Sequence, residues 1–146
     1  MKWCAQLRKS AVRPAAQQIV SRLSMRQIGF FEQFKGADTV LVSTTAEDAA
    51  ALAVELERFA QSQAAAVEVS AAPVPGHEAK LMAVREPRAS SDREFRWLCG
   101  GSEAPQIIAK LKSLATAGAG HQYFELCGSP AQLMVSVGEY VPKKDG

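Results

Sequence analysis

The sequence predicts an α+β domain in which two helices pack on one face of a mainly antiparallel sheet. Two amphipathic stretches have helical spacing, several short runs are rich in β-branched and aromatic residues, and Gly and Pro separate them at regular intervals. The predicted order is β-α-β-β-β-α-β-β, and the specific topology that it favours is ferredoxin-like. With 146 residues, 47% apolar and 22% charged, the chain suits one globular domain, and no apolar run is long enough for a membrane span.

The first predicted strand, Thr39–Ser43, leads straight into the first predicted helix. Its β-branched residues are typical of a buried strand. Thr44 and Glu47 have the spacing of a capping box, in which each side chain bonds a backbone N–H at the helix start. The helix, of about 17 residues, has one apolar face for the core. That face consists of Ala49, Leu52, Ala53, Leu56, Phe59 and Ala60.

Three strand candidates precede the second helix: Ala66–Ala71, Lys80–Arg85 and Arg93–Cys99. Alternation in the third candidate gives it an apolar face made of Phe95, Trp97 and Cys99. Ser102 is the predicted N-cap of the second helix, which ends at Gly118 or Gly120. The residues that this helix turns toward the core are Ile107, Ile108, Leu111, Leu114 and Ala115.

The last two predicted strands are His121–Cys127 and Gln132–Val137. If residues 128–131 form a hairpin loop, Cys127 lies opposite Gln132 and Phe124 lies opposite Val135. This register gives one apolar face, made of Phe124, Leu126, Leu133, Val135 and Val137. A slip by one residue would mix the two faces, so the pattern favours this register.

The opposite face carries the main candidate site. There His121, Tyr123 and Glu125 stand about 7 Å apart and face Gly138, Ser136 and Met134. A histidine near a carboxylate can act as a general acid or base, so a catalytic site is one interpretation. A partner-binding surface of His121, Tyr123, Glu125 and Ser136 is a second. The third is a solvated face, since an antiparallel sheet routinely has one.

The cysteines and histidines offer fewer candidates. The three cysteines are Cys4, Cys99 and Cys127, whose wide spacing indicates a reducing compartment and a cytoplasmic location. Cys99 is a weak candidate nucleophile with His121 as its base, although its apolar context favours a place in the core. His77 is expected in an exposed turn. With only two histidines we expect no metal site, and the turn at residues 100–102 lacks a phosphate-binding motif, so no cofactor is expected.

The charge is distributed unevenly along the chain. Residues 1–31 contain six basic and no acidic residues, whereas residues 32–146 contain 11 basic and 15 acidic ones. We therefore divide the chain into a basic extension (1–31), a single domain (32–140) and a tail (141–146). Three interpretations of the extension are open: a targeting presequence, an arm that contacts nucleic acid or membrane, or a disordered or misassigned stretch before a true start at Met25. Phe30, Phe31 and Phe34 are expected to form an apolar strap over the core.

The C-terminal region suggests a relationship. Gly120–Glu125 (GHQYFE) followed by Leu133–Tyr140 (LMVSVGEY) resembles the ending of small uncharacterised bacterial α+β proteins. Those proteins are similar in size and composition to immunity partners of bacterial toxins. The resemblance carries no catalytic signature, and it implies a binding role.

The leading functional hypothesis is therefore a small non-enzymatic module that binds one protein partner. Because the body of the chain is acidic, a basic partner would be electrostatically complementary. A homodimer would form if Gln132–Val137 lay at a sheet edge with unpaired backbone groups. The alternatives are a small enzyme that uses His121, Tyr123 and Glu125, and a protein that contacts nucleic acid through its basic arm.

Overall fold

A computed structural model describes residues 26–91 and 93–139, and it confirms the α+β class. The described residues form two helices and eight strands. The helices are α3 (Ala46–Gln61) and α4 (Glu103–Ala117). The strands are β2 (Gln27–Phe34), β3 (Ala37–Thr44), β4 (Ala66–Glu68), β5 (Ala72–Pro73), β6 (Lys80–Val84), β7 (Glu94–Leu98), β8 (Gly120–Glu125) and β9 (Gln132–Val137).

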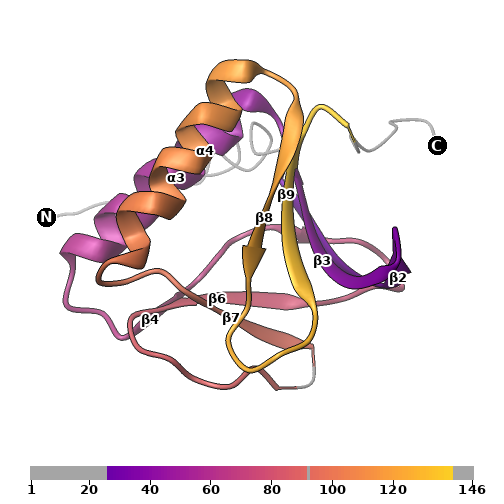
Figure 1. Ribbon diagram of the computed structural model, residues 1–146, viewed down its shortest axis with the longest axis horizontal. Helices are drawn as coiled ribbons and strands as arrows, with labels where there is room; N and C mark the ends of the chain where they lie inside the picture. Colours follow the sequence, from indigo (N-terminus) through magenta and orange to yellow (C-terminus); the bar gives the residue numbers. More distant parts are fainter. Residues whose placement is uncertain (1–25, 92, 140–146) are drawn as a thin grey trace, which may run out of the picture.

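The strands form two sheets, where the sequence predicted one ferredoxin-like sheet. The larger sheet has the order β5-β2-β3-β9-β8, and the smaller has the order β4-β6-β7. At the centre of the larger sheet β3 and β9 are parallel, while β2 and β8 pair with them in the antiparallel sense. In Figure 1 both helices lie on one side of this sheet, and the smaller sheet crosses near its lower end. The difference arises because three strands between the helices, β4, β6 and β7, build a sheet of their own, while β5 pairs with β2 at the edge of the larger sheet.

Strand β2 corrects the boundary of the predicted extension. It begins at Gln27 and pairs with β3, so residues 26–31 belong to the folded domain. Its phenylalanines are strand residues and not a separate strap, and the Phe30 ring stacks on Phe95 of β7 with centroids 5.4 Å apart. Residues 1–25 and the tail at 141–146 lie outside the described residues.

Arg26, counted in the basic arm by the sequence analysis, is buried, with 3% of its surface exposed. Its Nε and Nη2 donate to the two carboxylate oxygens of Asp48 at 2.9 and 3.0 Å. Nη1 and Nη2 also donate to Glu55 at 3.2 and 3.1 Å, and Nη1 donates to the carbonyl of Ser70 at 3.1 Å. Burial alone would lower the pKa of Arg26, but the two carboxylates outweigh it and raise that pKa. This ion cluster ties the start of β2 to α3.

Helix α3 begins one residue later than its capping signal predicts. The N-cap is Thr45, whose Oγ1 accepts a hydrogen bond from the Asp48 N–H at 3.1 Å, and not Thr44. Asp48 thus occupies the third helical position, where its carboxylate binds Arg26. The predicted apolar face is buried at Ala49, Leu52, Ala53, Leu56 and Phe59.

Helix α4 confirms one predicted cap and corrects the other. Ser102 is in the N-cap position but has helical backbone angles and makes no capping hydrogen bond with its side chain. Gly118 ends the helix with a φ of 83°, and its N–H donates to the Leu114 carbonyl at 3.1 Å. A left-handed residue at this position is the usual place for glycine.

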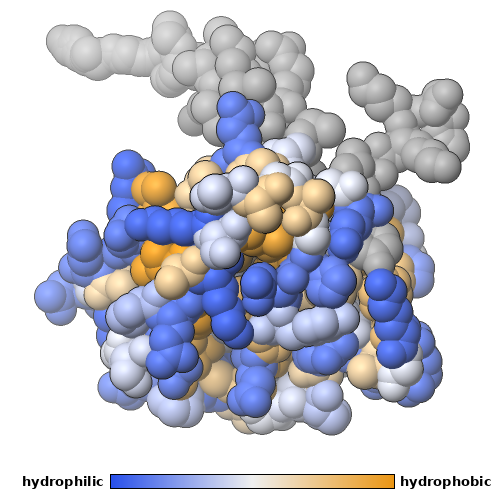
Figure 2. Space-filling view, turned by 45° about the horizontal axis from the view of Figure 1, so that its top comes forward, coloured by the Kyte–Doolittle hydropathy of each residue, from blue (hydrophilic) through white to orange (hydrophobic). Residues whose placement is uncertain are grey.

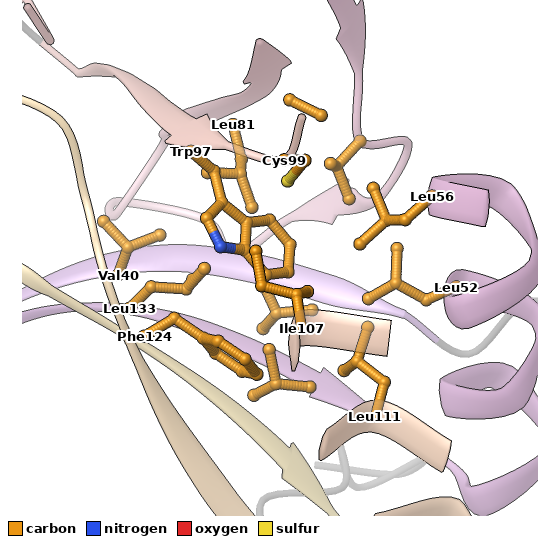
Figure 3. Close-up of a cluster of buried hydrophobic side chains, with 14 of the residues drawn as sticks. Val40, Leu52, Leu56, Leu81, Trp97, Cys99, Ile107, Leu111, Phe124 and Leu133 are labelled. Carbon is orange, nitrogen blue, oxygen red and sulfur yellow. The ribbon is translucent and has the colours of Figure 1, made fainter. Parts of the chain in front are cut away.

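The hydrophobic core lies where the two helices and both sheets meet. Trp97 of β7 is at its centre, surrounded by side chains from α3, α4 and the larger sheet (Figure 3). The ring of Trp97 lies 5.1 Å from that of Phe124 on β8, which joins the two sheets. On the face of the molecule in Figure 2, hydrophilic side chains surround small hydrophobic patches.

Candidate functional site

Strand β8 forms one edge of the larger sheet. Strand β9 lies between β3 and β8, so the condition for a homodimer through Gln132–Val137, a position at the sheet edge, is not met. The N–H of Gly138 donates to Thr44 at the end of β3. Since backbone groups alternate in direction along a strand, the even-numbered residues of β9 bond to β3 and the odd-numbered ones bond to β8. Their partners on β8 are Gly120, Gln122 and Phe124.

The backbone groups of the other β8 residues consequently point away from the sheet. These residues are His121, Tyr123 and Glu125. Within the described part of the chain, no backbone hydrogen bond to another segment occupies their N–H and C=O groups. The free edge is thus a row of donors and acceptors that could pair with another extended chain.

The register of β8 and β9 differs from the predicted one by two residues. Phe124 lies opposite Leu133, and His121 lies opposite Ser136. The predicted faces survive because a shift of two keeps every side chain on its own side. The shift arises because the connection is longer than a tight hairpin. The N–H of Cys127 donates to the carbonyl of Arg96 on β7 at 2.8 Å, which draws the chain away from β9.

A cleft of about 560 Å³ lies beside the free edge of β8, and we call it the α4–β8 cleft. Its lining comprises Trp97, Leu98, Glu103, Gln106, Ile107, Lys110, Tyr123, Phe124, Glu125, Leu126, Cys127 and Gln132. The ammonium of Lys110 lies 5.2 Å from the centroid of the Phe124 ring. The volume is typical of ligand-binding pockets, and the lining mixes aromatic and aliphatic surface with charges of both signs.

The structure separates the predicted site residues. Tyr123 and Glu125 line the α4–β8 cleft, whereas His121 does not. The Nδ1 of His121 lies 2.9 Å from Oε1 of Glu139, and the Ser136 hydroxyl donates to the same oxygen at 3.2 Å. The His121 ring also meets the Tyr123 ring edge-on, with centroids 5.3 Å apart.

Glu139 is the member of this cluster that the sequence analysis missed. The hydrogen bond from His121 is the largest influence on its pKa, which lies below its usual value. The ionised carboxylate only accepts hydrogen bonds, so we assign the proton of the imidazole to Nδ1. Gly138, with a φ of 75°, turns the chain so that Glu139 reaches the strand pair. In the sequence, the signal that could have indicated Glu139 is Gly138, the glycine directly before it.

The outer face of the larger sheet is less solvated than its sequence pattern suggests. Ser136, predicted as a partner-binding residue, is fully buried, as are Met134 and Thr39 on the same face. Ser136 therefore orients Glu139 and does not present its hydroxyl to a partner. Of the predicted residues, Tyr123 and Glu125 stay exposed, with 41% of the Tyr123 surface accessible.

Two further candidates prove to be structural. Cys99 is fully buried in the core, where burial, with a smaller contribution from Cys127, raises the pKa of its thiol. A buried thiol that stays protonated is a poor nucleophile, so this geometry does not support Cys99 as a catalytic residue. His77 is half-buried and not an exposed turn residue. Its ring stacks on Phe31 at 4.3 Å, and its Nδ1 lies 3.1 Å from the Phe30 carbonyl.

In the described part of the chain, neither a metal site nor a membrane-spanning helix indicates the function, and no known relative does so. Among the described residues, no group of three or more His, Cys, Asp or Glu side chains could hold a metal ion. None of the helices in residues 26–91 and 93–139 is long and apolar enough to cross a membrane. Searches against protein-family models, curated proteins and solved structures find no match.

Proposed function

We propose that this protein is a protein-binding module that holds an extended segment of its partner along β8, beside the α4–β8 cleft. The free backbone groups of three alternate residues on β8 are the observation that supports it most. In strand addition of this kind, main-chain hydrogen bonds supply affinity and side-chain pockets supply specificity. The cleft beside the edge is such a pocket.

The lining of the cleft indicates the chemistry of the segment. Trp97, Ile107 and Phe124 offer apolar surface to a hydrophobic side chain. Glu103 and Glu125 of the same lining can pair with a cation that flanks that side chain, and Lys110 can pair with an anion.

The enzymatic alternative finds less support in this geometry. The Ser136 hydroxyl has a possible base in Glu139 but is fully buried, so a substrate cannot reach it. Cys99 is enclosed in the core. His121 is oriented by Glu139 but stands outside the cleft where a substrate would be held.

A proline at Tyr123 tests the proposed binding edge. The N–H of Tyr123 points to the free edge, so Tyr123→Pro removes an outward donor without removing a bond to β9. Peptides selected from a random library against the full chain would be titrated calorimetrically against the wild type and two variants. The matched control is Val54→Ser, because Val54 is also 41% exposed but lies on α3 and not on β8.

Wild type and Val54→Ser should bind the selected peptides equally. Tyr123→Pro should bind at least about tenfold more weakly, because it loses an edge hydrogen bond and distorts the rest of the ladder. Hydrogen exchange should show peptide-dependent protection at His121, Tyr123 and Glu125. Equal affinity for Tyr123→Pro, or protection elsewhere, would overturn the proposal.

A further inference from the structure

We infer that the extended segment held by this edge is β8 of a second copy of the chain, paired antiparallel about a two-fold axis at Tyr123. The inference rests on the proposed function, since it uses the same free edge. It goes further because it names the occupant. A two-fold interface places the same surface of both copies in contact, so the sequence of β8 must be complementary to itself.

The outward backbone groups favour this register. They belong to His121, Tyr123 and Glu125, so only pairings that place these residues opposite one another form a ladder. Centred on Tyr123, the pairing uses all of them in both copies, whereas any other centre leaves at least one without a partner. The ladder would end where Cys127 leaves to bond Arg96 of β7.

The side chains are complementary in the same register. His121 of each copy lies opposite Glu125 of the other, and the two Tyr123 rings meet at the axis. Residues opposite each other in an antiparallel pair have Cβ atoms about 4.5–5.5 Å apart, close enough for these side chains to interact. Tyr123 is one of the exposed large apolar side chains of the described residues, and this contact would bury it.

The dimer should depend on pH because His121 would lie between two carboxylates. The groups around it are Glu139, Ser136 and Tyr123, and Lys35 acts on Glu139 through its charge. A neutral His121 donates from Nδ1 to Glu139 and leaves a lone pair on Nε2, which repels Glu125 of the second copy. The imidazolium donates to both carboxylates. Association should therefore be tighter at pH 6 than at pH 8.

Sedimentation of the full chain at concentrations from about 1 to 100 µM, at pH 6 and at pH 8, tests the inference. We expect a concentration-dependent increase from the 15.7 kDa monomer to twice that mass, with a dissociation constant several-fold lower at pH 6. Val54→Ser should behave as the wild type, and Tyr123→Pro should remain monomeric. Circular dichroism and urea unfolding of each variant establish that it is folded.

Two charge variants test the cross-strand pair itself. Glu125→Lys removes the carboxylate opposite His121 and places an ammonium there, so it should weaken the dimer at least tenfold. His121→Lys keeps a cation opposite Glu125 at both pH values, since lysine ordinarily titrates near pH 10. It should therefore preserve the dimer and abolish its pH dependence.

The outcomes separate the inference from the proposed function. A wild type that is monomeric throughout, or a Tyr123→Pro variant that dimerises like the wild type, overturns the inference. If the monomeric wild type still binds selected peptides at β8, only the inference fails. If it binds none there, the proposed function fails with it.

Discussion

Replacing Arg26 by alanine should destabilise the domain more than replacing an exposed arginine. Arg26 is 3% exposed and bonds both oxygens of Asp48, which is 8% exposed. Removing one member of a buried ion pair costs about 3–5 kcal/mol, because the other charge stays buried without compensation. Glu55 is 49% exposed and can turn to water, so the loss of its ion pair with Arg26 adds little to this cost.

The position of Asp48 lowers the expected cost to the bottom of that range. Asp48 lies in the first turn of α3, where the helix dipole still stabilises a negative charge by about 0.3–1 kcal/mol. We therefore expect Arg26→Ala to lower the free energy of unfolding by about 3 kcal/mol. The Ser70 carbonyl also loses a hydrogen-bond donor.

Urea unfolding followed by circular dichroism measures this difference. The control is Arg58→Ala, since Arg58 is exposed on the same helix and should cost less than about 0.5 kcal/mol. The double variant Arg26→Ala with Asp48→Asn removes the buried charge, so it should be at least about 1 kcal/mol more stable than the sum of the single effects. Additive effects, or a cost below about 1 kcal/mol for Arg26→Ala, would refute the role of the ion cluster.

Three further predictions concern single residues. Cys99 should resist alkylation in the folded protein and react only after unfolding in denaturant, as mass spectrometry of trapped adducts would show; labelling under native conditions would contradict its burial. The pKa of Glu139 is lower in the folded state, so its hydrogen bond with His121 stabilises the fold at pH values above 4.5, the ordinary pKa of this carboxyl group. The stabilisation is lost as the pH falls and Glu139 takes up a proton. Glu139→Gln should therefore flatten the acid limb of a stability–pH profile, and an unchanged limb would contradict this. Gly128→Ala should cost about 1–3 kcal/mol in urea unfolding, because Gly128 has a φ of 59° and a Cβ there would lie 2.9 Å from the Ala89 Cα; a neutral effect would show that this loop relaxes.

Local patterns predicted most of the elements correctly. The buried faces of both helices and the alternation in β7 follow from hydrophobic periodicity, which depends only on neighbouring residues. The end of α4 at Gly118 follows from the conformational freedom of glycine. Three of the four described strands between the helices, β4, β6 and β7, were predicted, although β4 ends at Glu68 and β5 was missed. Nothing local showed that β4, β6 and β7 form a separate sheet.

Long-range contacts decided what the sequence pattern could not. Arg26 looked like part of a basic arm because charge counting along the chain does not show a buried Asp48 on α3. The side-chain alternation of β8 and β9 fixes their faces but is unchanged by a two-residue shift, so the register depended on the bond between Cys127 and Arg96.

The candidate site shows the same division. The sequence by itself determined that His121, Tyr123 and Glu125 share one face of a strand, because side chains alternate with a period of two. Only the tertiary structure decided that this strand is the edge, since the parallel pairing of β9 with β3 places β9 inside the sheet. That pairing joins residues far apart in the chain, and among the described residues it leaves the outward backbone groups of β8 free to pair with another extended chain.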